Sequence, residues 1–563
     1  MSTLDAFLTR TRVAYFSMEI ALRAEMHTYS GGLGVLAGDT ARSCADLRLP
    51  VVFVTLASHE GYLRQEIAAD GSQIDHPDPW RVADWATPLD AMVGVAVEGR
   101  TVWIRPWLYR LAAADGYEIP VLLLDTRLEH NDPRDRGLTD RLYGGDDAYR
   151  LGQEIVLGIG GERLLRALGF EVGIYHLNEG HAALLTAALL KRHPHPLEVP
   201  AEGQLRYDTE WVREHCVFTT HTPVEAGHDR FDYAMAMRLL GDFLPEDQLK
   251  PLAGEDRLNM TRLALNLSGY VNGVAERHAE TARKMFPGYV VRAITNGVHA
   301  HSWVHPAFAK LFQSLAADWA HEPEELVRAD QLTDTELWSA HEAAKQALID
   351  TVARLGGVTL RMDLPILAFA RRITGYKRPD LLFSDLARLR AINAHHPFQL
   401  VIAGKAHPHD EPGKALVHAL NQHLRELAGE IPGTFLPDYG LDLARVMVAG
   451  ADVWLNTPQP PLEASGTSGM KAALNGVLNL SVLDGWWWEG WIEDVTGWGI
   501  GASGPASDHA NELYDTLEHK VLPRYYQDRA RWLGMMRASI SKTAPRFNSQ
   551  RMMRRYAAEA YLR

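Results

Sequence analysis

The segment LEASGTSGMKAALNG (residues 462–476) follows a short apolar run, residues 453–456, and opens a helical pattern. A buried strand that passes through a glycine-rich turn into a helix is the repeating unit of parallel α/β sheets. Residues 466–469 are small, and the backbone amides of such a turn at the start of a helix suit a phosphate group. This segment therefore predicts an α/β fold with an anion site at the end of one strand.

Lys471 lies in the first turn of the expected helix, where the helix dipole disfavours a positive charge. Two interpretations of this lysine remain open. Its amine is neutralised as a Schiff base with an aldehyde cofactor whose phosphate occupies the glycine turn, or the lysine is a solvated surface residue.

The alternation of strands and helices extends outward on both sides of this segment. In the first half we expect strands at residues 13–17, 51–56, 121–125, 174–178 and 216–221, and helices at residues 153–168 and 181–190. In the second half we expect strands at residues 366–371, 398–404, 434–437, 453–456 and 478–483. A charged helical stretch at about residues 330–355 separates the two series. We predict an α/β protein with two doubly wound domains that face each other across a cleft, with ligands at the carboxyl ends of the strands.

Composition narrows the class of protein further. The chain of 563 residues is 46% hydrophobic and 23% charged, which is enough apolar sequence for two large domains. Its formal net charge of −14 disfavours nucleic acid and anionic membranes as partners. The sequence has no secretory signal and no apolar run near ~20 residues, and Cys44 and Cys216 form neither a disulfide framework nor a metal motif. We therefore predict a cytoplasmic protein without a bound metal.

Two further clusters lie where expected strands run into loops. In YSGGLGVLAGD (residues 29–39) the glycines allow close approach to a ligand, but a tight packing turn explains them equally well, and the spacing is not a dinucleotide motif. FARRITGYKRP (residues 369–379) gathers four cations in an otherwise acidic chain. Such a cluster suits a dianionic phosphate, while one or two of the cations are expected to form ordinary ion pairs.

Together with these clusters, further motifs resemble the α-glucan phosphorylase family (glycogen, starch and maltodextrin phosphorylases) in its short bacterial and archaeal form. In chain order they are AYFSME (14–19), LYGGD (142–146), HLNEGHAA (176–183), TTHTP (219–223), VNGVAERH (271–278), ITNGVH (294–299), IAGKAH (402–407) and SVLDG (481–485). Residues 463–471 are the most specific part, because they resemble the family's pyridoxal phosphate lysine motif. This motif distinguishes the chain from nucleotide-sugar glycogen synthases of similar fold.

The resemblance implies a GT-B architecture and a hexosyltransferase of carbohydrate metabolism. The implied reaction is reversible phosphorolysis of α-1,4-glucan at the non-reducing end, which releases α-D-glucose 1-phosphate with retention and uses the 5′-phosphate of pyridoxal phosphate as proton relay. The expected partners are α-1,4-glucan or maltodextrin and inorganic phosphate, with a homodimer as one option. The expected units are residues 1–305 and 306–535, each Rossmann-like, and a helical segment, residues 536–563, that crosses back to the first domain.

The resemblance also assigns roles to residues of the site. The catalytic residues are Lys471, which carries the cofactor, Arg372, Lys377, His278 and Glu463. The cofactor is also held by Thr467, Ser468, Gly469, Trp303 and Tyr439. Substrate phosphate and the glucosyl unit are bound by Gly31, Gly32, Leu33, His221, Asn296, Ser465, Gly466 and Arg371. Glu463 is expected to bind sugar hydroxyls, because phosphate is already the nucleophile.

Two other classes of protein remain open: a retaining glucosyltransferase that uses a nucleotide sugar on the same fold, and a non-catalytic glucan-binding protein. Gly440 stands where the animal phosphorylases have an arginine near the cofactor, so the cofactor phosphate must be neutralised differently. The segment that carries phosphorylation and effector control in regulated members has no counterpart here, so we expect a constitutive enzyme. The tryptophans of residues 486–498 form either a glucan-binding wall or packing between domains.

Overall fold

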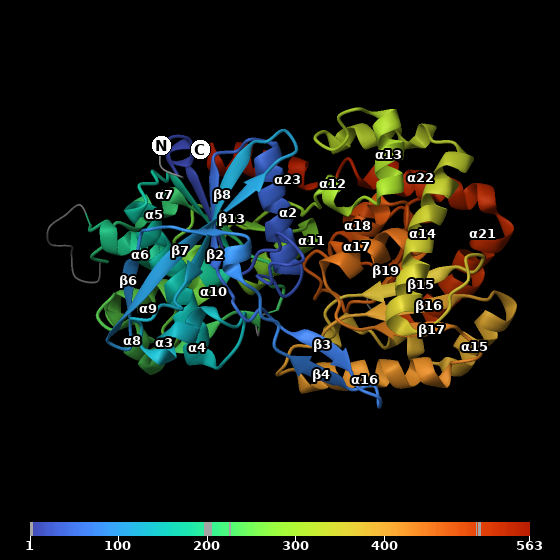
Figure 1. The fold of residues 1–563 in the computed structure, drawn as a ribbon, viewed down its shortest axis with the longest axis horizontal. Helices are drawn as coiled ribbons and strands as arrows, with labels where there is room; N and C mark the ends of the chain where they lie inside the picture. Colours follow the sequence, from blue (N-terminus) through green and yellow to red (C-terminus); the bar gives the residue numbers. More distant parts are fainter. Residues whose placement is uncertain (1–3, 196–204, 225–226, 503, 505–507, 563) are drawn as a thin grey trace.

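The computed structural model describes residues 4–195, 205–224, 227–502, 504 and 508–562. Figure 1 shows two sheets side by side, the first coloured blue to green and the second yellow to orange, each surrounded by helices. The fold is mixed α/β with largely parallel sheets, which confirms the predicted class at this level.

The first sheet has ten strands. They are β1 (Val13–Ser17), β2 (Val51–Leu56), β5 (Thr87–Pro88), β6 (Val93–Val97), β7 (Arg100–Ala112), β8 (Glu118–Asp125), β9 (Ile174–Asn178), β10 (Cys216–Thr219), β13 (Tyr270–Gly273) and β14 (Arg292–Ala293). Their order is β14-β13-β10-β9-β1-β2-β8-β7-β5, with β6 paired to β7. Pairing is parallel from β14 to β8, whereas β5, β6 and β8 pair antiparallel with β7.

The second sheet has six strands, all paired in parallel. They are β15 (Ile366–Ala370), β16 (Gln399–Ala403), β17 (Gly433–Leu436), β18 (Val453–Asn456), β19 (Leu478–Val482) and β20 (Gly497–Ile500). Their order is β17-β16-β15-β18-β19-β20. The order therefore reverses between β15 and β18, which is the strand arrangement that opens a crevice at the carboxyl edge.

Helices connect the strands and cover the sheets. In the first half they are α1 (Asp5–Leu8), α2 (Gly32–Asp46), α3 (Pro133–Arg136), α4 (Asp147–Ile155), α5 (Gly161–Ala167), α6 (Leu184–Arg192), α7 (Thr209–His215), α8 (Tyr233–Leu240), α9 (Glu246–Ala253), α10 (Met260–Asn266) and α11 (Glu276–Met285). Then follow α12 (Ala300–Trp303), α13 (Pro306–Leu315), α14 (Asp334–Gly356), α15 (Leu386–His395), α16 (Glu411–Glu426), α17 (Leu441–Gly450), α18 (Ser468–Leu474) and α19 (Trp487–Gly490). The last are α20 (His509–Thr516), α21 (Leu522–Gln527), α22 (Arg529–Thr543) and α23 (Ser549–Tyr556). Among the described helices, none combines the length and apolar character that a membrane span requires.

Apolar packing covers both faces of the first sheet. Along β1, Ala14 and Phe16 belong to one buried cluster, while Val13 and Tyr15 belong to another on the opposite face. Successive side chains of a strand point to opposite faces, so a strand that is buried on both sides reads as a continuous apolar run. This burial explains why the short apolar runs predict the central strands well.

Strands β1, β2, β9 and β18 have the predicted bounds, and the other predicted strands differ by a few residues at their ends. The predicted helix at 153–168 is divided, because residues Val156–Gly160 widen into a π-helix between α4 and α5. Several strands were missed, including the antiparallel β5, β6 and β7 and the short hairpin β3 (Arg64–Ile67) and β4 (Gln73–His76). Along β7 buried and exposed residues alternate, so its sequence lacks a continuous apolar run.

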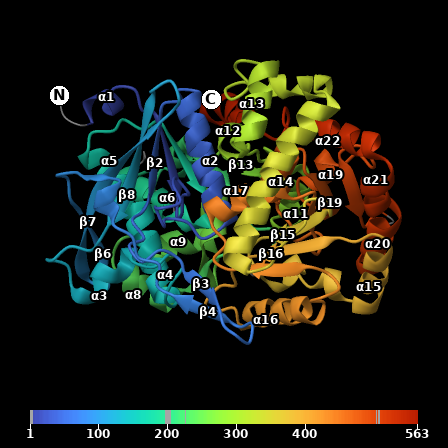
Figure 2. The same cartoon turned by 45° about the vertical axis from the view of Figure 1, so that its right-hand side comes forward.

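The hairpin β3–β4 reaches from the first half onto the second, where it lies beside α16 (Figure 2). The Gln65 side chain donates to the Gly404 carbonyl at 2.8 Å and accepts from the Asp438 amide at 3.0 Å. Gln73 donates to the Ala406 carbonyl at 2.9 Å and accepts from the Ala406 amide at 3.0 Å. Backbone groups at the ends of β16 and β17 are thus satisfied by side chains from the other half.

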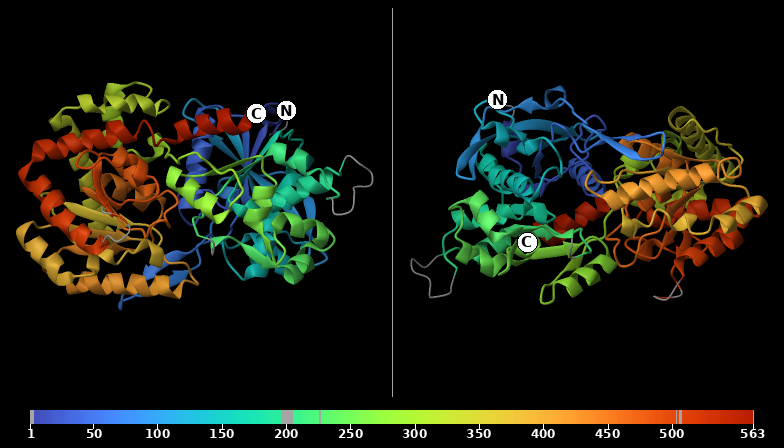
Figure 3. Two further views of the ribbon diagram at one scale, coloured as in Figure 1. Left: turned by 180° about the vertical axis from the view of Figure 1, so that it is seen from behind. Right: turned by 90° about the horizontal axis from the view of Figure 1, so that it is seen from below.

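The C-terminal segment also joins the halves. Figure 3 shows it in red, running from the side of the second sheet back to the first. There α23 packs on α2, with Ser43 Oγ and Ser549 Oγ 2.6 Å apart, and Met552 and Met553 are buried in the first half's core.

Candidate active site

The candidate residues gather at the carboxyl ends of the strands. In the second sheet, the cation cluster follows β15 and the glycine turn with Lys471 follows the neighbouring β18. In the first sheet, Glu19 follows β1 and Glu179 follows the neighbouring β9. Each pair of strands flanks the point where the strand order reverses, so the fold brings four segments distant in sequence to the places where such sheets bind ligands.

Glu463 is the centre of a buried ion cluster. Its carboxylate lies 2.5 Å from the Arg371 guanidinium and 2.8 Å from the Lys377 amine. Burial acts to raise the pKa of Glu463, but the two cations outweigh it and hold the pKa at about 2. Arg372 is exposed, and its guanidinium donates to the Tyr376 hydroxyl at 3.1 Å. An anion can therefore reach Arg372 without displacing a carboxylate.

Lys471 is buried in α18 and 7% exposed. Its amine lies 3.9 Å from the centre of the Trp303 ring, and no described residue forms a hydrogen bond with it. Burial lowers the pKa of Lys471 to about 8; Asp39 raises this pKa, and Arg42 and Arg445 lower it. The solvated-surface interpretation of this lysine is therefore wrong.

The turn before α18 has the geometry of an anion cradle. Gly466 has a φ of +78°, which favours glycine, and Thr467 is the residue that caps α18 without a side-chain bond to the helix. A Cβ on Gly469 would lie 2.5 Å from Asn479 Oδ1 and 2.9 Å from the Trp486 ring. Packing therefore requires glycine at position 469. The Gly469 amide lies in the first turn of α18.

Several buried polar atoms of the predicted site residues have no protein partner within the described part of the chain. They are Nε and Nη1 of Arg371, Oγ of Ser465 and Oδ1 of Asn296. Unpaired buried polar atoms are costly unless a ligand or water satisfies them. Arg371 and Ser465 belong to the second half, and Asn296 belongs to the first.

The two predicted histidines lie on the first half's side. His278 accepts a hydrogen bond at Nδ1 from the Val274 amide, and His221 Nε2 lies 2.6 Å from Asn178 Oδ1. Burial lowers the pKa of both histidines to about 4. Near pH 7 they are therefore neutral hydrogen-bonding groups.

The glycine-rich segment of residues 29–39 is held by a residue to which the sequence alone assigned no role. Glu19 accepts from the Ser30 amide at 2.6 Å, from the Gly31 amide at 3.2 Å and from the Tyr143 hydroxyl at 2.8 Å. The Gly31 amide is thus engaged by Glu19, while a Cβ on Gly31 or Gly32 would meet no atom within 4 Å. The feature of the sequence that could have indicated Glu19 is its position, because it closely follows β1 and ends the motif of residues 14–19.

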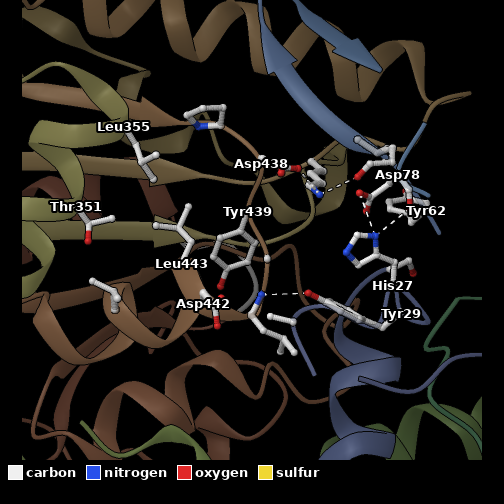
Figure 4. Close-up of a pocket in the computed structure, with 18 of the residues that line it drawn as sticks. His27, Tyr29, Tyr62, Asp78, Thr351, Leu355, Asp438, Tyr439, Asp442 and Leu443 are labelled. Carbon is white, nitrogen blue, oxygen red and sulfur yellow. Dashed lines mark hydrogen bonds and ion pairs between the residues drawn. The ribbon is translucent and has the colours of Figure 1, made fainter. Parts of the chain in front are cut away.

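Tyr439 lines a cavity of about 550 Å³ between the halves (Figure 4). Figure 4 shows His27, Tyr62 and Asp78 on one side of it and Thr351 and Leu443 on the other. The Tyr29 hydroxyl accepts a hydrogen bond from the Leu441 amide at 3.1 Å. Neither Lys471 nor Glu463 is among the residues that line this cavity.

The tryptophans of residues 486–498 are mainly packing residues. Trp486, Trp487 and Trp498 are buried, and Trp486 packs against Phe547. Trp488 is 49% exposed, and the guanidinium carbon of Arg277 lies 4.5 Å from the centre of its ring. Among the described residues, no group of three or more histidines, cysteines or acids is arranged to hold a metal ion.

A buried lysine, a glycine turn and clustered cations at strand ends define the class of α/β proteins that handle a phosphate-bearing group. Within the chain, residues 224–489 match the Phosphorylase family model, described as carbohydrate phosphorylase. The chain is 38% identical to maltodextrin phosphorylase of Thermococcus litoralis, over 98% of this chain and 70% of that protein. It is 36% identical to glycogen phosphorylase of Mycobacterium tuberculosis (98% and 71% covered) and 34% identical to that of Aquifex aeolicus (98% and 86% covered). The chain belongs to the α-glucan phosphorylase family.

Proposed function

We propose that this protein catalyses the reversible phosphorolysis of α-1,4-glucan, releasing α-D-glucose 1-phosphate from the non-reducing end with retention. The observation that carries the proposal is the Lys471 amine, buried over Trp303 beside the glycine turn. A buried lysine whose amine forms no hydrogen bond with any described residue is costly unless it serves chemistry. The relatives named maltodextrin and glycogen phosphorylase support the substrate class.

The proposed architecture is GT-B. Residues 1–305 and 306–535 form the two Rossmann-like domains that face each other across a cleft, and residues 536–563 return to the first domain. The reversal of strand order in each sheet supports this assignment. The last boundary lies inside α22 (Arg529–Thr543), which packs on the second half, and the packing on the first half begins with α23.

The residues present fit pyridoxal phosphate as the cofactor. Lys471 would hold its aldehyde, and Trp303 would pack on its ring side. Tyr439 is assigned to the cofactor by the family resemblance. Thr467 and the amides of Ser468 and Gly469 would hold its phosphate at the start of α18. When bound, the cofactor supplies a phosphate group that relays a proton to and from the substrate phosphate.

The remaining residues of the site bind and orient the substrates. Arg372, Lys377 and Arg371 bind the substrate phosphate, with the amides of Gly32 and Leu33 opposite them and Gly31 setting the turn. The glucosyl unit is held by Glu463, Ser465, Asn296, His221 and the Gly466 amide. Their preorganised dipoles, with the His278 carbonyl, stabilise the positive charge that develops on the sugar ring.

The proposed partners are α-1,4-glucan or maltodextrin and inorganic phosphate, with a homodimer as the proposed assembly. We place the protein in the cytoplasm, because Cys44 and Cys216 are both unpaired and buried, as suits a reducing compartment.

The test is an assay of the purified protein with maltoheptaose and inorganic phosphate, and separately with UDP-glucose or ADP-glucose and maltoheptaose. We expect α-D-glucose 1-phosphate from the first mixture and no chain extension in the second. Chain extension from a nucleotide sugar without phosphorolysis would overturn the proposal in favour of a glucosyltransferase. Glucan binding without either reaction would overturn it in favour of a binding protein.

A further inference from the structure

A buried carboxylate on α2 holds the tryptophan that lies beside the Lys471 amine. Asp39 lies on α2 and is 1% exposed. Its Oδ2 accepts from the Trp303 indole N–H at 2.8 Å and from the His299 amide at 3.2 Å, and Arg42 lies 3.5 Å from Oδ1. The function proposed above assigns Asp39 no role.

Trp303, which Asp39 orients, is the surface on which the Lys471 amine lies. The backbones of the two residues are also tied together, because Asn475 Nδ2 donates to both carbonyls at 2.9 Å. The Trp303 backbone is therefore tied to Asn475, which follows α18, and its indole nitrogen is tied to Asp39 on α2. A loss of the Asp39 contact would free the ring to rotate while its backbone stays in place.

The charges that face Lys471 come from two helices. Asp39 and Arg42 lie on α2, and Arg445 lies on α17, where it pairs with Asp442 at 2.9 Å. Arg42 and Arg445 oppose a positive charge on the lysine, and Asp39 favours it. Of these three groups, Asp39 alone favours the charged form of the amine.

We propose that Asp39 is a positioning residue for Lys471: it fixes the Trp303 ring against the amine and supplies the opposing negative charge across the two halves. The proposal rests on the proposed function only in that Lys471 carries the cofactor. It predicts two separable effects, one on the charge of the amine and one on the retention of pyridoxal phosphate.

Competitive acetylation across pH, with the Lys471 peptide quantified by mass spectrometry, measures the pKa of the amine in the cofactor-free full-length protein. In Asp39→Asn the pKa is expected to fall by about one unit, because the negative charge is lost while an oxygen for the Trp303 N–H remains. Asp363→Asn is the matched control, because Asp363 is exposed and paired with Arg361. An unchanged pKa in Asp39→Asn would overturn the charge role.

Retention of pyridoxal phosphate by the loaded full-length protein tests the positioning role. Trp303→Phe keeps a ring but removes the donor to Asp39, so we expect the cofactor to be lost about tenfold faster while the Lys471 pKa stays near that of the wild type. Retention equal to the wild type would overturn the positioning role.

Two results distinguish a failure of the proposed function from a failure of the role proposed for Asp39. If the wild type binds no pyridoxal phosphate, the proposed function and the positioning role fail, whereas the acetylation result still decides the charge role. If Asp39→Asn does not fold, Asp39→Glu keeps the charge but displaces the carboxylate by one methylene, so it should keep the pKa and lose cofactor faster. Behaviour identical to the wild type in both measurements would contradict the proposal.

Discussion

In the loop after β15, Arg372 lies outside the ion cluster around Glu463. Glu463 engages Arg371 and Lys377, whereas the exposed Arg372 contacts a neutral tyrosine hydroxyl. Charge-assisted hydrogen bonds are stronger than neutral ones, so an incoming phosphate gains more at Arg372 than the tyrosine does. We therefore propose Arg372 as the first contact for substrate phosphate.

Replacement of Arg372 by methionine should raise the KM for inorganic phosphate about tenfold, because one charge-assisted hydrogen bond is lost. Initial rates at saturating maltodextrin and varied phosphate measure it. The control is Arg390→Met, which removes a half-buried arginine paired with Glu426 and Glu430 and should leave the KM unchanged. An unaltered KM for phosphate in the Arg372 variant would place the phosphate elsewhere.

Among single residues, the sequence predicted those whose residue type indicates their chemistry. It did not predict those that act through contacts with distant parts of the chain. Lys471 and the cations stand out in glycine-rich or acidic surroundings. Asp39 meets Trp303 across a separation of 264 residues, and Glu19 is an ordinary acid until its bonds to Ser30 and Gly31 are seen. Such pairings depend on the assembled fold, so no local pattern contains them.

At the scale of secondary-structure elements, close packing rather than turn geometry sets the position of α18. Gly469 fits under Trp486 and beside Asn479, which brings the helix start against the sheet. By contrast, Gly534 in α22 has open space around the place of a Cβ. The two helical glycines thus offer a matched comparison.

Gly469→Ala should destabilise the protein by about 1–3 kcal/mol, because the added methyl overpacks a buried contact. Gly534→Ala should instead stabilise it by about 0.5–1 kcal/mol, because alanine is the better helix former and meets no atom. Urea unfolding of the two variants measures both values. Equal effects of the two substitutions would contradict the packing account.

The hairpin β3–β4 shows which elements sequence reasoning could not find. It is four residues on each strand with mixed exposure, so it has too few apolar residues for a strand pattern. Its stability comes from the second half, through Gln65 and Gln73. The central strands were predictable because burial on both faces makes their sequence continuously apolar.

Gln65→Leu should destabilise the protein by about 1–3 kcal/mol, because the Gly404 carbonyl and the Asp438 amide lose their buried partner. Chemical unfolding followed by tryptophan fluorescence measures the change. Gln422→Leu is the control, because it removes an exposed side-chain bond to the Asp70 carbonyl. If Gln422→Leu lowered the free energy of unfolding as much as Gln65→Leu, the Gln65 contact would not be what joins the hairpin to the second half.

At the scale of the whole molecule, the halves are joined by the hairpin, by the C-terminal helices and by the site itself. Gln65 bridges to the ends of β16 and β17, and Ser549 meets Ser43 on α2. Asp39 and Trp303 then connect α2 to the surroundings of Lys471. The geometry of the site therefore depends on both sheets at once.

Acid should destabilise the first half through its buried histidines. Burial lowers the pKa of His176 to about 3 and of His181, His221 and His278 to about 4, from 6.5. The unfolded chain then binds more protons below pH 6.5, so stability is full above that value and falls as the pH drops toward 4. Burial raises the pKa of Glu19 and Glu154, which acts in the opposite sense and reduces the net effect.

The free energy of unfolding, measured with urea at pH 7 and at pH 5, should be lower at pH 5. Calorimetry in buffers of different ionisation enthalpy should report net proton uptake on unfolding at pH 5. A free energy that is constant or rises toward pH 5 would contradict the neutral, buried state of these histidines.

The most direct test of the account is the fate of pyridoxal phosphate in the wild type and in Lys471→Ala. The purified proteins are reconstituted with the cofactor, reduced with borohydride and digested, and the labelled peptide is identified by mass spectrometry beside an assay of α-D-glucose 1-phosphate release. We predict label at Lys471 alone in the wild type, and neither label nor phosphorolysis in the variant. Phosphorolysis by a wild type that carries no label at Lys471, or by Lys471→Ala, would contradict the central claim.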